Sequence, residues 1–163
     1  MTKNIVILGA GTAGTMMSNH LRRALKDEWN ITIIDQRTEH HYQPGYLFVP
    51  FGVYEPEDIV KPIEKFIPDG VNLKLGAIDK IYPDKDKVVM VSGEEFNYDI
   101  LIVATGTDIA PEETEGMMGP HWHKDVFDFY TLEGAAALAK KFKDWEGGKL
   151  VVNIAEMPIK CPV

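Results

Sequence analysis

The residues best suited to chemistry in this chain form a glycine cluster near its start, Gly9-Ala10-Gly11-Thr12-Ala13-Gly14. In such a turn Gly9 permits a tight bend, Gly11 leaves the backbone open to a pyrophosphate, and Gly14 allows the next helix to pack closely. Asp35 lies about 20 residues further on and can accept hydrogen bonds from ribose hydroxyls, while its charge would repel a 2′-phosphate. Together these residue types indicate a dinucleotide-binding site.

The flanking sequence indicates the elements that must position these residues. Residues 4–8 are a continuous apolar run rich in β-branched side chains, as in a parallel strand buried on both faces. Residues 13–26 repeat apolar side chains at helical spacing, and residues 31–34 predict a second buried strand that ends at Asp35. The helix N-terminus would offer unpaired N–H groups and a partial positive charge to the pyrophosphate. The alternative is a glycine turn that binds nothing, but the complete strand–turn–helix–strand order favours a dinucleotide.

Composition limits the class of protein. The chain has 163 residues, of which 45% are hydrophobic and 26% charged, as is typical of one ordinary globular domain. No apolar run approaches the roughly 18 residues that span a membrane, and no signal-peptide pattern is present. A formal net charge of −8 argues against nucleic acid as a partner, because phosphate backbones select basic surfaces. The single cysteine excludes an internal disulfide framework and fits a reducing cytoplasm.

A small antiparallel sheet is predicted in the middle of the chain. Residues 71–79, 88–91 and 95–98 alternate in part between apolar and polar side chains, and turn-forming residues separate them. A buried strand follows within residues 98–106 and ends in a turn of small residues at 104–106. The fold class predicted from these patterns is α/β: a Rossmann-like unit with a parallel sheet and a small antiparallel β-meander.

Taken together, these motifs resemble the FAD-dependent pyridine nucleotide-disulfide oxidoreductases, a flavoprotein superfamily with two dinucleotide domains, over nearly the whole chain. The resemblance implies that the first unit binds FAD and that the turn at 104–106 packs near the flavin pyrophosphate. It also implies that a residue pair after the first strand of the meander meets the adenine through backbone groups. Carried over to this sequence, the implied cofactor-binding residues are Gly9, Ala10, Gly11, Thr12, Ala13, Gly14, Asp35, Gln36, Ala77, Ile78, Ala104, Thr105 and Gly106.

The loop after the second strand narrows the resemblance. Residues 40–47 are similar to the H-x-Y-x-P-x-Y-x stretch of sulfide:quinone oxidoreductases and flavocytochrome c sulfide dehydrogenases, in which this loop runs beside the flavin. The loop adds Gln43 and Pro44 to the implied cofactor contacts. The first helix lacks the CxxxxC pair of the disulfide reductases proper. No metal site is predicted at the adjacent histidines, because no Cys, His or carboxylate set with ligand spacing accompanies them.

The only cysteine, Cys161, is the candidate catalytic residue. Its setting, Pro158-Ile-Lys-Cys161-Pro, is similar to the Pro-x-x-Cys-x-x context of a cysteine near the flavin in sulfide:quinone oxidoreductases. The resemblance implies that Cys161 accepts sulfide sulfur or forms a flavin adduct, since a polarizable thiolate can hold sulfur while two electrons pass to the flavin. From the residues alone, the alternative is a small buried side chain without a catalytic role.

The function that the resemblance implies is the oxidation of sulfide, with electrons passed through FAD to a quinone. The alternatives are a flavoprotein similar to flavocytochrome c sulfide dehydrogenase or to type II NADH dehydrogenase, and an FAD-binding module without turnover. A second GxGxxG after Ile154 would favour NADH, and residues 156–160 do not supply it. The expected setting is cytoplasmic, with peripheral membrane contact in a longer parent protein, and a homo-oligomer is expected.

Three segments are predicted along the chain. They are an FAD-binding unit at 1–110, a connection at 111–131, and the helix and first strand of a second, truncated dinucleotide-type domain at 132–163. The family resembled carries a second essential cysteine and further domains that have no counterpart in these 163 residues. We therefore expect an amino-terminal piece of a longer flavoenzyme that is inactive on its own.

Local patterns predict the elements outside the first unit. Thr131 is expected to cap a helix over residues 132–145, which glycines 147 and 148 would end. Residues 149–154 are expected to form a strand, and its unpaired edge would favour self-association. Residues 55–66 suggest one further short helix.

Overall fold

The computed structural model describes residues 2–25 and 28–154. The chain divides into two compact units, the first formed by Met1–Tyr42 with Glu57–Thr107 and the second by Gln43–Pro56 with Asp108–Val163. This division places residues 43–56 with the later part of the chain, although sequence analysis kept them inside one segment, 1–110. The three predicted domain ranges therefore stay a prediction.

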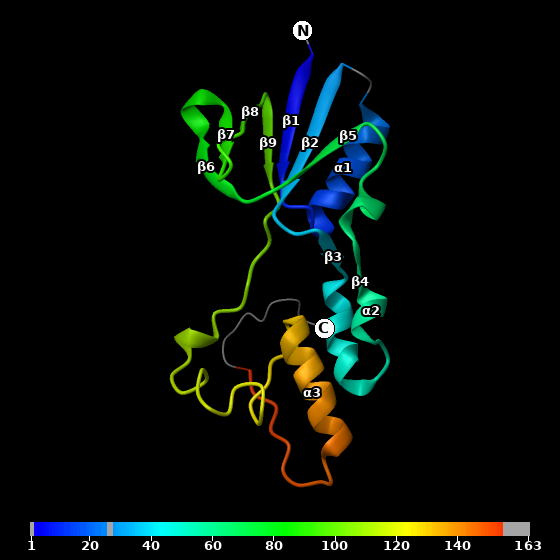
Figure 1. Cartoon of the computed structure of the whole chain (residues 1–163), viewed down its shortest axis with the longest axis vertical. Helices are drawn as coiled ribbons and strands as arrows, with labels where there is room; N and C mark the ends of the chain where they lie inside the picture. The colour runs from blue at the N-terminus through cyan, green and yellow to red at the C-terminus, as the bar shows by residue number, and fades with distance from the viewer. Residues whose placement is uncertain (1, 26–27, 155–163) are drawn as a thin grey trace. The chain divides into compact units, whose positions relative to one another are not determined.

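A four-stranded parallel sheet is the centre of the first unit (Figure 1). Its strands stand in the order β5-β2-β1-β9, and each neighbouring pair is parallel. This arrangement confirms the predicted α/β class. The strands are β1 (Lys3–Leu8), β2 (Trp29–Asp35), β5 (Val71–Leu75) and β9 (Ile100–Val103).

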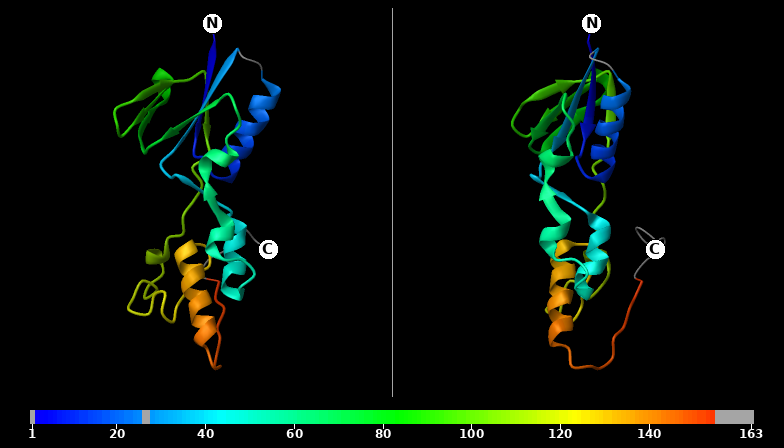
Figure 2. Two further views of the ribbon diagram at one scale, coloured as in Figure 1. Left: turned by 45° about the vertical axis from the view of Figure 1, so that its right-hand side comes forward. Right: turned by 90° about the vertical axis from the view of Figure 1, so that its right-hand side faces the viewer.

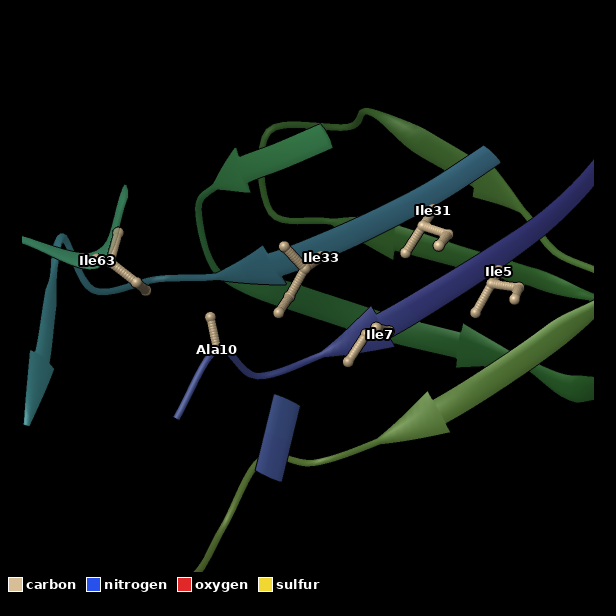
Figure 3. Close-up of a cluster of buried hydrophobic side chains, with 6 residues drawn as sticks. All are labelled: Ile5, Ile7, Ala10, Ile31, Ile33 and Ile63. Atoms are coloured by element: carbon tan, nitrogen blue, oxygen red, sulfur yellow. The ribbon is translucent and has the colours of Figure 1, made fainter. Parts of the chain in front are cut away.

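Helix α1 (Thr12–Ala24) covers one face of this sheet. Because successive side chains of a strand point to opposite faces, alternate residues of β1 and β2 face the helix. Leu21 and Leu25 pack against this cluster from the helix and its C-terminal cap. The fully or almost fully buried members of the cluster, drawn in Figure 3, are Ile5, Ile7, Ala10, Ile31, Ile33 and Ile63.

An antiparallel sheet of three strands packs on the opposite face, as both views of Figure 2 show. Val6, Leu8 and Ile34 point toward it and pack with Val88 and Met90. The predicted meander is therefore present, and its strands carry the register Val88↔Phe96 at their centre. The strands are β6 (Ile78–Tyr82), β7 (Lys87–Met90) and β8 (Glu95–Asn97), and the 3₁₀ turn η3 (Pro83–Lys85) joins the first two.

The prediction that residues 71–79 form the first meander strand is wrong for its first half. Strand β5 instead joins the parallel sheet, with Ile31 paired to Val71. Gly76 separates β5 from β6, and its φ of +152° is one that side-chain-bearing residues rarely adopt. A Cβ there would also meet the methyl group of Met90. The run 71–79 is thus two strands in two sheets, joined at a glycine.

Between β2 and β5 the chain forms short elements in place of the single helix expected there. Helix α2 (Pro56–Ile59) lasts only four residues, and a 3₁₀ turn, η2 (Ile63–Phe66), follows. Between them β4 (Val60–Pro62) pairs antiparallel with β3 (Glu39–His41). This pairing and the proline at 62, which cannot donate an N–H, end the helix early.

The second unit contains a 3₁₀ segment, η1 (Gln43–Phe51), a 3₁₀ turn, η4 (Pro111–Glu113), and helix α3 (Leu132–Asp144). The predicted cap is confirmed, because Thr131 accepts a hydrogen bond from the Gly134 N–H. Phe51 of η1 and Phe142 of α3 contact each other with ring centroids 5.8 Å apart. The predicted strand at 149–154 is wrong, since these residues form no strand and are paired with none of the described strands.

Candidate functional site

The three glycines of the loop between β1 and α1 have three different structural roles. Gly9 has φ +95°, and a Cβ there would collide with the backbone carbonyl of Ala104. A Cβ at Gly14 would collide with the Gly9 carbonyl oxygen and lie 3.4 Å from Ile33. At Gly11 a Cβ would meet nothing within 4 Å, so the space beside this residue is open. Two of the glycines are therefore required by packing, and the third leaves room for a ligand.

The N-terminus of α1 is arranged to receive an anion. Gly11 is the N-cap, so no side chain caps the helix, and the first turn contains no acidic residue. Gly11, Thr12 and Ala13 are exposed. The first N–H groups of a helix have no partner within it and carry the positive end of the helix dipole. An open, uncapped and exposed helix start fits the pyrophosphate of FAD.

Asp35 at the end of β2 ties the loop to its surroundings. Its Oδ2 accepts a hydrogen bond of 2.6 Å from the Ala10 N–H, and its Oδ1 accepts one of 2.8 Å from the Arg37 N–H. The Asp35 backbone carbonyl accepts a third, of 2.8 Å, from the Gly76 N–H. A carboxylate has more acceptor sites than these two side-chain bonds use. The predicted contact with ribose hydroxyls is compatible with this geometry and stays a prediction.

The small-residue turn after β9 lies beside the glycine loop. The Ala104 N–H donates a 2.7 Å hydrogen bond to the Leu8 carbonyl, directly before Gly9. A Cβ placed on Gly9 would also approach the Thr105 Cα to 3.0 Å. Gly106 then turns the chain with φ +75°. The structure thus brings this predicted segment to the carboxyl ends of the parallel strands, where ligands bind in open α/β sheets.

The remaining predicted residues differ in how closely they join this arrangement. Ala77 follows Gly76, which is bonded to Asp35, while Gln36 is exposed directly after Asp35. Ile78 packs half-buried on the second core cluster. Gln43 and Pro44 begin η1 in the second unit. Their cofactor contacts stay a prediction.

The candidate catalytic residue, Cys161, lies outside the described residues. Among the residues that are described, no group of three or more His, Cys, Asp or Glu side chains is arranged to hold a metal ion. No helix within residues 2–25 and 28–154 is long and apolar enough to cross a membrane.

His40 is a residue of this site that sequence reasoning missed. Its ring lies in β3, and Nδ1 is 3.1 Å from the carbonyl oxygen of Ala10 in the glycine loop. Phe66 packs against the same imidazole ring, with the two ring centroids 4.3 Å apart. The sequence signal was the pair His40-His41, which the motif of the loop had already singled out without a role for either ring.

A polar cluster in the second unit was also missed. The Asp128 side chain is only 9% exposed and accepts hydrogen bonds from the Tyr130 N–H, from the N–H and hydroxyl of Thr131, and from His123. A Cβ at Gly134 would collide with the Asp128 carboxylate. Asp128 therefore holds the cap of α3 in place. The sequence does not indicate this role, because Asp128 is a single acid in an irregular segment.

Comparison with known proteins adds to this geometry. The family model for pyridine nucleotide-disulphide oxidoreductases matches residues 3–153. The chain is 25% identical over 158 residues to the mitochondrial sulfide:quinone oxidoreductase of Dictyostelium discoideum, covering 96% of this chain and 35% of that protein. It is 32% identical over 145 residues to the type II NADH:quinone oxidoreductase of Staphylococcus aureus, covering 87% of this chain and 34% of that protein.

Among solved structures, the sulfide:quinone oxidoreductase of the hyperthermophilic bacterium Aquifex aeolicus matches with a TM-score of 0.70 and 25% identity. The match covers 87% of this chain and 32% of that one. The chain thus spans about a third of the length of the relatives that it matches.

Proposed function

Because this chain belongs to the pyridine nucleotide-disulphide oxidoreductase family, a family of FAD-binding flavoproteins, we propose that it is the cofactor-holding part of an enzyme that oxidises sulfide and passes the electrons to a quinone. The observation that carries the FAD assignment is the loop itself: two glycines are needed for packing, while Gly11 leaves an open, uncapped helix start. Sulfide and quinone are supported by the names of the relatives and by the similarity of residues 40–47 to sulfide-oxidising flavoproteins.

The residues of the chain divide the work of holding the cofactor. The exposed N–H groups at the start of α1 would bind the pyrophosphate, and the helix dipole would stabilise its charge. Asp35 would orient the ribose, since its position is fixed by the Ala10 and Arg37 N–H groups. The turn at 104–106 would close the site from the neighbouring strand. Bound FAD would supply the two-electron acceptor that no protein side chain provides.

For the substrate step we propose Cys161. Joining the Cys161 thiolate to a sulfide sulfur forms an S–S bond with loss of two electrons, which bound FAD would accept, so the cysteine could hold the sulfur atom during its oxidation. A second candidate function, oxidation of NADH, is favoured by the 32% identity to type II NADH:quinone oxidoreductases. We also propose a cytoplasmic location with peripheral membrane contact, and assembly as a homo-oligomer.

The test is a spectroscopic one. The full-length protein that carries this chain is loaded with FAD and mixed, without oxygen, with sulfide or with NADH. Loss of the flavin absorbance with sulfide supports the proposal, whereas loss with NADH alone supports the second candidate. Two variants separate the parts: Gly11→Val is expected to bind FAD more weakly, and Cys161→Ser to keep FAD while losing the reaction with sulfide. Equal sulfide reactivity of Cys161→Ser and the unmodified chain would contradict the role of the cysteine.

A further inference from the structure

We propose that His40 is a positioning residue of the dinucleotide site, holding the Ala10 carbonyl through Nδ1–H and thereby directing the Gly11 N–H toward the ligand. The inference rests on the proposed function only for the identity of that ligand, FAD. The contact itself joins two segments of the first unit, β3 and the glycine loop.

The donor and acceptor roles in this contact determine which imidazole nitrogen carries the proton. A backbone carbonyl oxygen can only accept a hydrogen bond, so a bond of 3.1 Å between it and Nδ1 requires the proton on Nδ1. Phe66 packs against the same ring at 4.3 Å between centroids and restricts its rotation. The donor is therefore supplied by a ring that packing already holds.

The effect of this bond reaches Gly11 through the peptide plane. A trans peptide is planar, so the C=O of Ala10 and the N–H of Gly11 point in opposite directions along the same rigid unit. Fixing the carbonyl therefore fixes the N–H. Gly11 is the exposed N-cap with open space around it, where a phosphate oxygen would accept that bond.

Asp35 acts on the other side of the same residue. Its carboxylate holds the Ala10 N–H, and by the same planarity it fixes the Gly9 carbonyl against which Gly14 packs. Ala10 is thus held at both polar groups by side chains that lie five positions apart, at the end of β2 and in β3. A flexible glycine-rich loop loses conformational entropy when it binds a ligand, and these two bonds remove part of that loss in advance.

The experiment compares FAD affinity in the full chain and in three variants, by titration of flavin fluorescence. His40→Phe keeps a ring against Phe66 and removes the donor, so we expect the dissociation constant to rise about two- to tenfold, the usual weight of one hydrogen bond. His40→Asn carries an N–H donor at the same bond distance from Cβ and is expected to restore most of the affinity. His20→Phe, the matched control at an exposed position of α1, is expected to leave the affinity unchanged.

Unchanged affinity in His40→Phe, or no recovery in His40→Asn, would overturn the positioning role. A second measurement does not depend on FAD: imidazole nitrogen shifts of the unliganded chain should report the Nδ1-protonated form, and the Gly11 amide signal should move in His40→Phe and return in His40→Asn. The other tautomer, or an unmoved Gly11 signal, contradicts the inference. If the unmodified chain binds no FAD while these signals behave as expected, the proposed function fails and the positioning of Gly11 stands.

Discussion

The two units of this chain bury their side chains in different ways. In the first unit, fully buried aliphatic residues of β1 and β2 form two clusters, one on each face of the parallel sheet. In the described part of the second, the buried hydrophobic side chains are Tyr46, Val49 and Ala135, and they form no cluster on a sheet. A regular sheet satisfies its backbone and buries its side chains at once, whereas an irregular segment must be held by individual contacts.

The glycine loop of the first unit and the start of α3 in the second unit differ in a similar way. The glycine loop depends on backbone geometry, because Gly9 and Gly14 leave no space for a side chain. The start of α3 depends on one carboxylate, Asp128, which binds three different residues. Substitutions should therefore act through steric overlap in the first unit and through lost hydrogen bonds in the second.

The largest effect is expected from Gly14→Val. Its Cβ would overlap the Gly9 carbonyl, a backbone atom that cannot turn away as a flexible side chain can, and would crowd Ile33. Overpacking of this kind typically costs about 1–3 kcal/mol and more where the backbone must move. We expect the free energy of unfolding to fall by at least the upper end of that range. The fall is measured as a lower urea midpoint, followed by circular dichroism. A stable Gly14→Val variant would show that helix α1 can retreat from the sheet.

Gly11→Val sharpens the contrast within the same loop. A Cβ there meets nothing within 4 Å, so folding should change little beyond the weaker capping of α1. The side chain would nevertheless occupy the space proposed for the pyrophosphate and remove hydrogen bonds to a charged group, weakening FAD about tenfold to a hundredfold. Titration with FAD measures the affinity, and a urea unfolding curve measures the stability. Wild-type affinity of the variant would show that the ligand does not bind at this loop.

Asp128→Ala should affect the second unit. It leaves the N–H groups of Tyr130 and Thr131 and the ring of His123 without their acceptor, in a place where the carboxylate is 9% exposed. Loss of buried hydrogen-bond partners costs about 1–3 kcal/mol, whereas Thr131→Ala, which removes the cap and the hydroxyl bond to Asp128 but keeps both N–H bonds to that carboxylate, should cost about 1 kcal/mol. Hydrogen exchange of the α3 amides measures both. Equal effects would assign the cap to Thr131 by itself.

The smallest effect concerns Asp125, whose pKa is lowered from 3.8 by a hydrogen bond from Lys141 and then by one with His121. Because the folded pKa lies below the unfolded value, the stabilisation is present above that value and is lost as the pH falls through the folded pKa. The Asp125 side chain is exposed, so the effect should be slight and weaken with salt.

Asp125→Asn should therefore lower the urea midpoint at neutral pH and match the wild type near the acid end. Asp144→Asn, which removes the same charge at the end of α3, is the control. A difference between Asp125→Asn and the wild type that persisted in strong acid would point to a cause other than ionisation.

Much of the first unit could be predicted from the sequence, because its requirements are met by neighbouring residues. The run at 4–8, the glycine spacing and Asp35 each specify a strand, a turn or a strand end by residue type alone. The partner of a strand is a different matter. Residues 71–75 have the same pattern in a parallel or an antiparallel sheet, and only the turn at Gly76 and the long-range pairing with β2 decide between them.

Side-chain contacts over long distances were the part that sequence could not supply. His40 bonds to Ala10 across 30 positions, and nothing in the residues between them encodes that approach. In the second unit, residues 149–154 are as apolar as a strand, yet apolar residues form a strand only where a second backbone offers hydrogen bonds. Residue patterns predict elements, and the contacts among elements complete the site.

The pairing of β1 with β9 also sets the time at which the chain can acquire its binding loop during synthesis. The Asn4 N–H donates to Asp99 over 95 positions, and Ala104 closes against Gly9 only once β9 has paired. At about 5–20 residues per second, the ribosome delivers β9 roughly 5–20 seconds after β1. Throughout that interval the backbone groups along one edge of β1 stay unpaired, and most side chains of the strand are apolar. A nascent chain that stalls before residue 100 would therefore expose an unpaired apolar strand to chaperones, and its glycine loop would not yet be complete for binding the cofactor.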